Sequence, residues 1–289
     1  MKIAVFSDIQ ANVPAMEAVI DEILAWRPDR VIMNGDLVNR GPCSLQCLEL
    51  FEQMQNEHGW EPLRGNHEDY VIYCRNNPPK SDNDAAMRRF TDFTVEQMGG
   101  AAERMLAWPD HVILPDAKLA DWVHITHGTL AGNRVGVMRH HSDDDLAGRI
   151  SSWASLFVTA HTHRPLERQL NNTTILNVGS AGSPFDGDPR GSWAKLEHNS
   201  NGWQTEIIRF DYDRNRAEQD YHDTGFLEQG GPIARMIYEE WKQARSLLPH
   251  WRRRYLRDIG DGRVSVEGSV EAFLAQGGFP DNTDTRCCV

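Results

Sequence analysis

The sequence has little of what several large protein classes require. Its 289 residues carry 30 Lys and Arg against 42 Asp and Glu, a net charge of −12, whereas a protein that coats nucleic acid needs a net basic surface. Its apolar runs all fall short of the ~20 residues that cross a bilayer. Asp8 and Gln10 interrupt the apolar N-terminal run, which is therefore expected to be a buried strand and not a signal peptide. Five cysteines, an odd number without framework spacing, predict a cytoplasmic protein.

Short β-branched runs alternate with segments of helical period in the first quarter of the chain. Strands are expected at residues 2–7, 30–33 and 60–64, and helices at 14–26 and 44–57. This β-α-β-α-β alternation is typical of an α/β fold with a central sheet.

The rest of the chain changes character twice. After a polar, helical stretch at 69–108, the candidate strands are 111–114, 122–126, 156–160, 173–178, 193–197 and 204–210, with a helix expected at 143–153. Beyond Asp213 the pattern becomes helical, most strongly at 233–248, and the residues from Gly277 onward are expected to be disordered. We therefore predict one domain at residues 1–212 and a helical C-terminal extension at residues 213–289 that packs on it.

Polar side chains and histidines follow directly on five of the predicted strands. They are Asp8, Asp36, Asn66 with His67, His127, and His161 with His163. In an open α/β sheet, ligands bind outside the carboxyl ends of the strands, so these residues are expected to face one crevice. Glycine before Asp36 and before Asn66 permits turns that bring the backbone close to a ligand. In an extended segment, the period of two would place His161 and His163 on one side, and Asp8 and Gln10 likewise.

Taken one at a time, these residues have ordinary structural interpretations. A single His is more often hydrogen-bonded than metal-bound, and Asp or Asn after Gly is common turn chemistry. Two Asp, one Asn and three His buried together without a partner would be costly, because each desolvated polar group must be satisfied. Divalent cations would satisfy them, and mixed Asp, Asn and His ligands favour Mn, Fe, Co, Ni or Zn over calcium.

Five segments, in this order, resemble the motif set of the calcineurin-like metallophosphoesterases. They are Ser7-Asp8-Ile9-Gln10, Gly35-Asp36-Leu37-Val38-Asn39-Arg40-Gly41-Pro42, Arg64-Gly65-Asn66-His67-Glu68, Thr126-His127-Gly128 and Ala160-His161-Thr162-His163. Residues 176–182 and 186–190 are similar to the small bacterial branch of that superfamily. The resemblance covers residues 1–212, and it implies a four-layer αββα double-sheet sandwich that holds two metal ions.

The resemblance also implies roles for individual residues. It implies a first metal held by Asp8, Asp36 and His163 with Gln10 beside them, and a second metal held by Asn66, His127 and His161, with Asp36 bridging the two. It implies that His67 is the catalytic histidine near the leaving group. Arg40 matches the position of an arginine that grips a phosphate.

Two positions depart from the family pattern. Gln10 stands where the family usually has His. A neutral amide oxygen is a poorer ligand, so we expect a weaker first site that favours Mn, or a Gln10 that only hydrogen-bonds metal-bound water. Asn39 stands where the protein-phosphatase branch has an Asp that favours the protonated form of the catalytic histidine. Glu68 and Asp69 are the candidate carboxylates that could replace it.

These features predict a divalent-metal-dependent phosphomonoesterase or phosphodiesterase with two metal ions, Mn first and Fe, Zn, Ni or Co as alternatives. Two cations bridged by a carboxylate generate hydroxide near neutral pH and hold phosphorus in line with it, while a proton donor at His67 would contribute about 10²–10⁴ in rate. The acidic composition favours a small phosphoester such as a nucleotide as partner and disfavours nucleic acid, and the short apolar runs predict no membrane partner.

Three alternatives stay open at this point. In a dinucleoside-polyphosphate hydrolase, Arg40 would grip an extra phosphate. In a serine/threonine-phosphatase-like enzyme, the substrate would be a phosphoprotein. In a non-catalytic metal- or nucleotide-binding protein, Gln10 would have weakened the first metal site.

Overall fold

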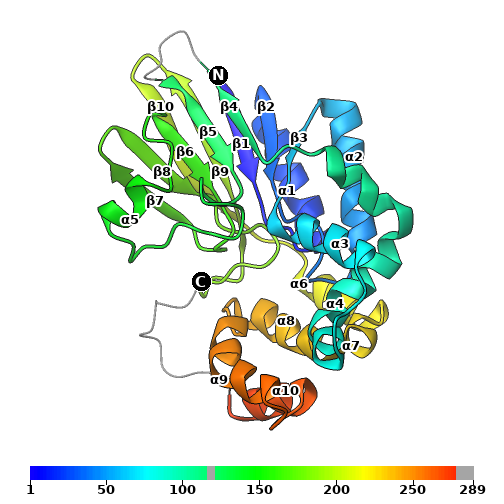
Figure 1. The fold of residues 1–289 in the computed structure, drawn as a ribbon. Helices are drawn as coiled ribbons and strands as arrows, with labels where there is room; N and C mark the ends of the chain where they lie inside the picture. Colours follow the sequence, from blue (N-terminus) through cyan, green and yellow to red (C-terminus); the bar gives the residue numbers. More distant parts are fainter. Residues whose placement is uncertain (116–120, 278–289) are drawn as a thin grey trace.

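Two five-stranded sheets face each other in the computed structural model, which describes residues 1–115 and 121–277 (Figure 1). The first sheet has the order β10-β9-β1-β2-β3, formed by Gly202–Phe210, Gly191–Asn199, Lys2–Phe6, Arg30–Asn34 and Glu61–Leu63. The second has the order β4-β5-β6-β8-β7, formed by His111–Leu114, Val123–Thr126, Leu156–Thr159, Thr173–Asn177 and Leu166–Leu170. Because β1, β2 and β3 run parallel, as do β5, β6 and β8, their carboxyl ends lie at one edge of each sheet.

Helices cover the first sheet and continue beyond it at the C-terminal end of the chain (Figure 1). Those before the second sheet are α1 (Val13–Trp26), α2 (Ser44–His58), α3 (Asn66–Asn76), α4 (Asp82–Met98) and the 3-10 helix η1 (Gly99–Ala107). The short helix α5 (Asp143–Ala147) lies between strands of the second sheet in the chain. The helices that follow the last strand are α6 (Arg214–Asp223), α7 (Phe226–Gln229), α8 (Gly231–Gln243), α9 (Leu248–Gly260) and α10 (Val266–Ala275). α1 starts where the sequence predicts it, because the Asn12 side chain accepts the N–H of Ala15 and Pro14 occupies the first turn.

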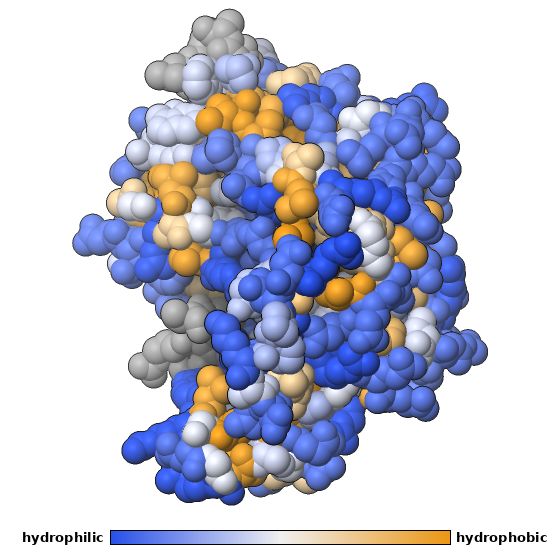
Figure 2. Space-filling model, turned by 45° about the vertical axis from the view of Figure 1, so that its right-hand side comes forward, coloured by the Kyte–Doolittle hydropathy of each residue, from blue (hydrophilic) through white to orange (hydrophobic). Residues whose placement is uncertain are grey.

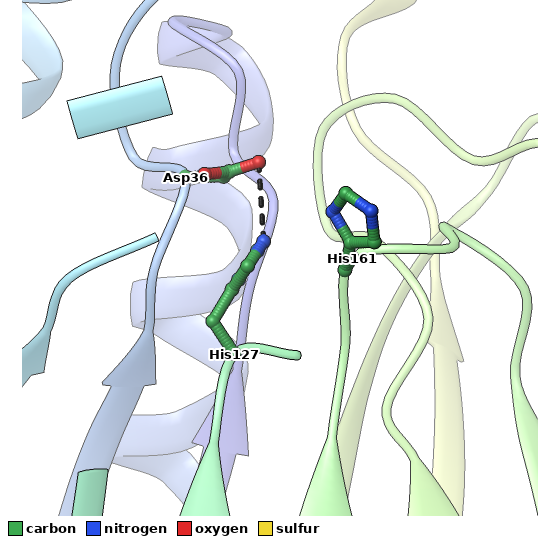
Figure 3. Close-up of side chains that lie close together, drawn as sticks. All are labelled: Asp36, His127 and His161. Atoms are coloured by element: carbon green, nitrogen blue, oxygen red, sulfur yellow. Dashed lines mark ion pairs between the residues drawn. The ribbon is translucent and has the colours of Figure 1, made fainter. Parts of the chain in front are cut away.

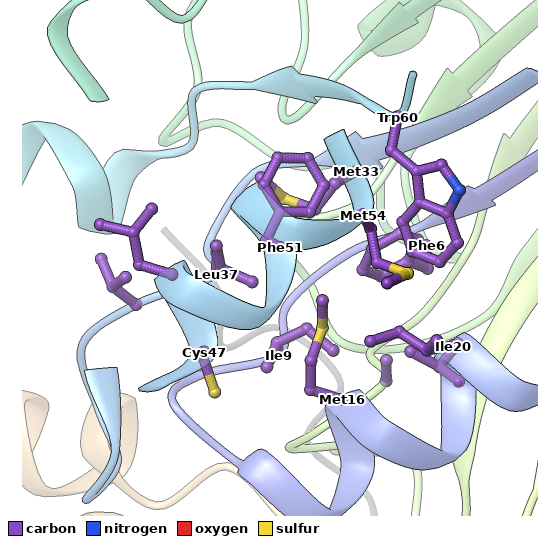
Figure 4. Packing of buried hydrophobic residues seen from close by; sticks show 14 of the residues in the cluster. Phe6, Ile9, Met16, Ile20, Met33, Leu37, Cys47, Phe51, Met54 and Trp60 are labelled. Carbon is purple, nitrogen blue, oxygen red and sulfur yellow. The ribbon is translucent and has the colours of Figure 1, made fainter. Parts of the chain in front are cut away.

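Alternating side chains of the strands build the layers. Ala4 and Phe6 of β1 pack toward the helices, in a cluster with Phe51 of α2 (Figure 4). Ile3 and Val5, which point the other way, pack against apolar residues of the second sheet. A smaller cluster joins the outer face of that sheet to α5 and its flanking loops. The four-layer αββα sandwich is thus confirmed, with a thin outer layer on the second sheet.

Three local expectations differ from the structure. The helix expected at 143–153 ends at Ala147, where Gly148 follows. The helical stretch expected at 233–248 is divided between α8 and α9, because Ala244 adopts a left-handed conformation with φ of 50°. The sequence pattern misses β7, an edge strand whose middle residues are polar. The disorder expected from Gly277 onward concerns residues that, from 278, lie outside the described part of the chain.

The C-terminal helices share an apolar cluster with α4. Phe90 and Phe93 of α4 pack with Phe226 of α7 and Trp241 of α8, and the ring centroids of Phe93 and Phe226 lie 5.4 Å apart. The helical C-terminal region is therefore continuous with the packing of the first part of the chain. The division at residues 212 and 213 falls between β10 and α6 and stays a prediction.

The surface is polar over most of the face seen in Figure 2, where apolar residues form small separate groups. The large apolar side chains with the most exposure include Leu106 and Leu130, each 53% exposed, and scattered apolar residues of this kind are normal on globular proteins. Within residues 1–115 and 121–277, the structure has no helix that is both long enough and apolar enough to cross a membrane.

Candidate metal centre

The carboxyl ends of strands from both sheets bring the predicted ligands into one place. Asp8 follows β1, Asp36 follows β2, Asn66 opens α3 after β3, His127 follows β5, and His161 and His163 follow β6. The two sheets meet at this edge, since the backbone N–H of His161 donates to Oδ2 of Asp8 over 3.3 Å, although 153 residues separate them. The crevice expected from the sequence pattern is therefore lined by residues of both sheets.

Two sets of three side chains at this edge could each hold a metal ion. One set is Asp36, His127 and His161, and the other is Asp8, Asp36 and His163; within each set the ligand atoms lie within 4.8 Å of one another. Asp36 belongs to both sets, so one carboxylate lies between two candidate cation positions. Figure 3 shows Asp36 and His127 in contact, with the imidazole of His161 opposite them.

Asp36 is the most heavily contacted of these groups. Its Oδ2 lies 3.3 Å from Nε2 of His127 and accepts a hydrogen bond from Nε2 of Gln10 over 3.2 Å. Its Oδ1 accepts the backbone N–H of His67 over 2.8 Å. Burial raises the pKa of Asp36, but the charge of the His127 ring, together with the hydrogen bonds from His127 and from the backbone N–H of His67, outweighs it and holds the pKa well below the usual value. Asp36 is thus an ionised carboxylate in a fully buried position.

Backbone carbonyls fix the ring nitrogens of two histidines. Nδ1 of His127 donates to the Asn34 carbonyl over 2.8 Å, and Nδ1 of His163 donates to the Ser183 carbonyl. Burial favours the neutral ring of His127, but the charge of Asp36 outweighs it and raises the pKa of His127 to about 10, so that Nε2 carries a proton toward that carboxylate. A cation that displaced this proton would meet the Nε2 lone pair, in the tautomer that metal-binding histidines adopt. Nε2 of His127 also lies 3.2 Å from Oδ1 of Asn66. Burial and the neighbouring His127 lower the pKa of His161 to about 4, so its ring is neutral at neutral pH.

Two buried acceptor atoms in the centre lack a donor among the described residues. They are Oδ1 of Asp8 and Oε1 of Gln10. Oδ1 of Asp8 lies 3.0 Å from Nε2 of His163, which is an arrangement of two acceptors that only a proton or a cation between them makes favourable. Mixed carboxylate, amide and imidazole donors without hydrogen-bond partners fit divalent transition metals. The residues present therefore fit the metal ions that the sequence motifs imply.

The backbone of the centre is strained. Asp8, Gln10, Asp36, His161 and His163 all have φ between 52° and 66°, a left-handed conformation that costs non-glycine residues free energy and that concentrates at functional sites. The expectation that Asp8 to Gln10 and His161 to His163 form extended segments is therefore wrong. Each pair lies in a tight turn after its strand, and the turn directs its side chains into the crevice.

Glycine is required beside Asp36 for steric reasons. Gly35 has φ of 84°, and a Cβ there would lie 2.7 Å from the backbone of Gly65 and 2.8 Å from Nδ1 of His127. A Cβ on Gly65 would lie 2.2 Å from Oδ1 of Asp36. The two turns thus pass one another at a distance that only glycine allows, as the sequence motifs predict.

Glu68 is a functional candidate whose role the sequence motifs do not indicate. Its fully buried carboxylate accepts four backbone N–H groups: Asp36 and Gly65 at 2.8 Å on Oε2, and Leu37 and Val38 at 2.8 and 3.3 Å on Oε1. Burial and the Asp36 charge raise the pKa of Glu68 to about 7, against the lowering effect of these N–H donors. Glu68 therefore holds the turn after β2 against the start of α3. The capping-box position three residues after Gly65 is the signal that could have found it.

At Nδ1, His67 faces Asn39 and not a carboxylate. Nδ2 of Asn39 lies 3.0 Å from Nδ1 of His67 and 3.1 Å from Oγ1 of Thr91. Burial lowers the pKa of His67 to about 3, and the nearby Asp36 opposes that effect only in part. The oxygens of Glu68 are taken up by backbone N–H groups, and Asp69 pairs with Arg64 and Asn133. In the described part of the chain, neither carboxylate replaces the Asp that Asn39 lacks.

Arg40 contacts a residue that no sequence motif connects to the centre. Its Nη2 lies 2.5 Å from Oε2 of Glu240 in α8, 200 residues further along the chain. Its guanidinium also lies over the ring of Phe185, 5.6 Å from the centroid, and Phe185 stacks on the imidazole of His163 at 4.2 Å. Glu240 and Phe185 are missed by sequence reasoning because nothing local distinguishes them from ordinary helix and loop residues.

Sequence comparison now gives the family. Residues 1–175 match the model of the calcineurin-like phosphoesterases, which is more than half of the 289 residues. The chain therefore belongs to the calcineurin-like phosphoesterase family, as the motif resemblance indicates. Among curated proteins, none matches this chain.

Solved structures agree with this assignment at the level of the fold. A metallophosphoesterase from Sphaerobacter thermophilus superposes with a TM-score of 0.64 at 22% identity, over 84% of this chain and 99% of that chain. The hypothetical protein PH1004 from Pyrococcus horikoshii OT3 superposes with a TM-score of 0.69 at 15% identity, over 85% of this chain and 99% of that chain. At these identities the likeness establishes the fold alone.

Proposed function

We propose that this protein is a phosphoesterase that uses two divalent metal ions to hydrolyse a small phosphoester. The observation that carries the proposal is the pair of donor sets that share the buried carboxylate of Asp36. Membership of a phosphoesterase family indicates the class of reaction. The buried oxygen atoms of Asp8 and Gln10 that have no hydrogen-bond partner are a chemical reason to expect cations at these positions.

The ligand assignment follows the two donor sets. Asp8, Gln10 and His163 hold the first metal, Asn66, His127 and His161 hold the second, and Asp36 contributes to both. For Gln10, direct coordination is favoured, because its Nε2 is engaged by Asp36 while its Oε1 has no donor among the described residues. An amide in place of an imidazole suits Mn better than Zn, and we propose Mn as the first choice.

The chain's own residues then act on the substrate around these ions. Bound divalent ions supply Lewis-acid polarisation of the phosphoryl group and activation of water. Because Nδ2 of Asn39 donates to Nδ1 of His67, the neutral ring carries its proton on Nε2, which lies 4.0 Å from Oδ2 of Asp36. His67 is therefore placed to donate a hydrogen bond to the departing ester oxygen.

The charge pattern favours a small substrate. The chain has a net charge of −12, which repels long polyanions outside the centre. A dinucleoside polyphosphate loses part of the support that Arg40 gave it, because the buried carboxylate of Glu240 already engages Nη2 and offsets the charge of the guanidinium, which leaves less attraction for an extra phosphate. Asn39 weakens the analogy with phosphoprotein phosphatases, because it replaces the Asp that their branch has at this position. The cytoplasmic location expected from the cysteine content stays part of the proposal.

Elemental analysis combined with hydrolysis of nitrophenyl mono- and diesters tests the proposal. We expect about two metal ions per chain and turnover that depends on added Mn, and the ratio of the two ester rates identifies the class of ester. A chain that binds one ion or none, and that hydrolyses neither ester with Mn, Fe, Zn, Ni or Co, would refute it. The non-catalytic binding protein would then be the better interpretation.

A further inference from the structure

Arg40 occupies a loop that is fixed on both sides of the residue. Asn39 and Arg40 have φ of 69° and 54°, and a Cβ on Gly41 would lie 2.1 Å from the carbonyl oxygen of Gln10. The loop after β2 therefore passes against the turn that carries Gln10. The Arg40 side chain is 12% exposed. Its direction is set by its contact with a residue of the C-terminal helical region.

Glu240 lies beyond the loop, in the C-terminal helical region, and it is rigidly held. Its side chain is fully buried. Its Oε1 accepts the backbone N–H groups of Leu247 at 2.5 Å and Leu248 at 2.8 Å, where α9 begins. Its Oε2 accepts from Nη2 of Arg40 at 2.5 Å. A buried carboxylate with both oxygens occupied is a fixed point to which a guanidinium can be aligned.

The guanidinium remains close to the candidate metal centre. It lies over the ring of Phe185, which also stacks on the His163 imidazole. It is also near enough to His67 that its charge contributes to the lowered pKa of that histidine, after the larger effects of burial and of Asp36. Glu240 engages Nη2, and Nε of Arg40 is buried without an acceptor in the described residues. An arginine has five N–H donors in a planar fork, so one contact with Glu240 leaves donors for an anion.

We propose that Glu240 is a positioning residue that aligns Arg40 with the phosphoryl group of the substrate, so that the C-terminal helices complete the phosphate-binding site. This inference rests on the proposed phosphoesterase function. Arg40 and Glu240 together carry no net charge, so Arg40 orients the phosphoryl group through hydrogen bonds and adds little net electrostatic attraction for it. A fixed donor of this kind suits a substrate with one phosphoryl group at the metals, and not a chain of phosphates.

A purely structural pair, which only ties the C-terminal helices to the catalytic loop, is the competing interpretation. The two interpretations differ in what a substitution changes. A structural pair affects the melting temperature and leaves phosphate affinity unchanged well below it. A positioning residue affects phosphate affinity in protein that is fully folded.

The test compares Glu240→Gln and Arg40→Lys with Glu239→Gln, all loaded with Mn. Glu239 is the matched control, because it lies on the same helix and contacts Gln243 at 2.8 Å. Inorganic phosphate is titrated by calorimetry, and KM and kcat are measured with a nitrophenyl phosphate, at a temperature where circular dichroism reports full folding. Arg40→Lys keeps the charge that Glu240 needs, so it serves where Glu240→Gln does not fold.

For Glu240→Gln and Arg40→Lys we expect phosphate Kd and KM to rise about tenfold, with kcat changed much less and metal content unchanged. Glu239→Gln should match the wild type. Unchanged or tighter phosphate binding in both variants would overturn the positioning role. If wild-type protein binds phosphate but hydrolyses no ester, the proposed function fails while the calorimetry still decides the role of Glu240. If wild-type protein hydrolyses an ester but binds no phosphate, the proposed function stands and an unchanged KM in both variants overturns the positioning role. If it neither binds phosphate nor hydrolyses an ester, both proposals are overturned.

Discussion

Glu68→Gln tests whether the buried carboxylate of α3 holds the metal-binding turns in place. Each carboxylate oxygen accepts two backbone N–H groups, from Asp36 and Gly65 on one side and from Leu37 and Val38 on the other. A glutamine has one oxygen and one NH₂ group, so two buried donors lose their acceptor in either orientation. An unsatisfied buried donor costs about 1–3 kcal/mol. We therefore expect a loss of about 3 kcal/mol, a large part of the about 5–15 kcal/mol that stabilises a typical protein.

Urea unfolding of the metal-free chain, followed by tryptophan fluorescence, measures this loss without a contribution from bound metal. Glu96→Gln is the control, because Glu96 is 59% exposed and pairs only at the surface with Arg89, and it should stay within about 0.5 kcal/mol of the wild type. Since the Asp36 peptide unit loses its support, Mn affinity should also fall about 10–100-fold. A Glu68→Gln protein with wild-type stability and Mn affinity would refute the reasoning.

Three further substitutions test the other parts of the centre. Asp36→Asn removes the carboxylate that both ligand sets share, so bound metal measured by elemental analysis should fall by about half or more; an unchanged metal content would exclude the shared role. His67→Ala should keep its metal and lose about 10²–10⁴ in kcat, whereas wild-type turnover would mean that another group acts on the leaving oxygen. Asn39→Asp gives His67 a charged acceptor at the 3.0 Å contact, and should raise kcat for alkyl phosphates more than for nitrophenyl phosphates, whose leaving groups need no proton. Equal effects on both types of ester would contradict this.

The fold and the gathering of the candidate ligands are predictable from the sequence because both depend on local signals. Each of Asp8, Asp36 and His127 follows an apolar strand, and parallel strands end at a common edge. Gly35 and Gly65 mark close approaches of the backbone, and the structure has both turns packed against each other. Periodicity and turn chemistry carry this information within a few residues, so no knowledge of distant contacts is required.

The parts that could not be predicted depend on contacts between distant segments or on strain. Glu240 meets Arg40 across 200 residues, and nothing in the α8 sequence distinguishes it from a surface glutamate. The turn at His161 and His163 reads as an extended segment, because a left-handed conformation of histidine is unfavourable and only tertiary packing imposes it. β7 is missed because an edge strand carries polar residues that obscure its period.

The strain and the buried charges of the centre have a common explanation in preorganisation. Positive φ values at Asp8, Asp36, His161 and His163 cost about 1–3 kcal/mol each, and the chain sustains them through Glu68 and through the carbonyls that orient His127 and His163. Donor atoms held in this way do not need to be ordered when a cation binds, so little of the binding free energy is lost to reorganisation. The same rigidity keeps Asp36 between the two donor sets. We therefore expect residues that bear no candidate ligand atom to affect how well the centre can hold metal, and Glu68, which accepts four backbone N–H groups, most of all.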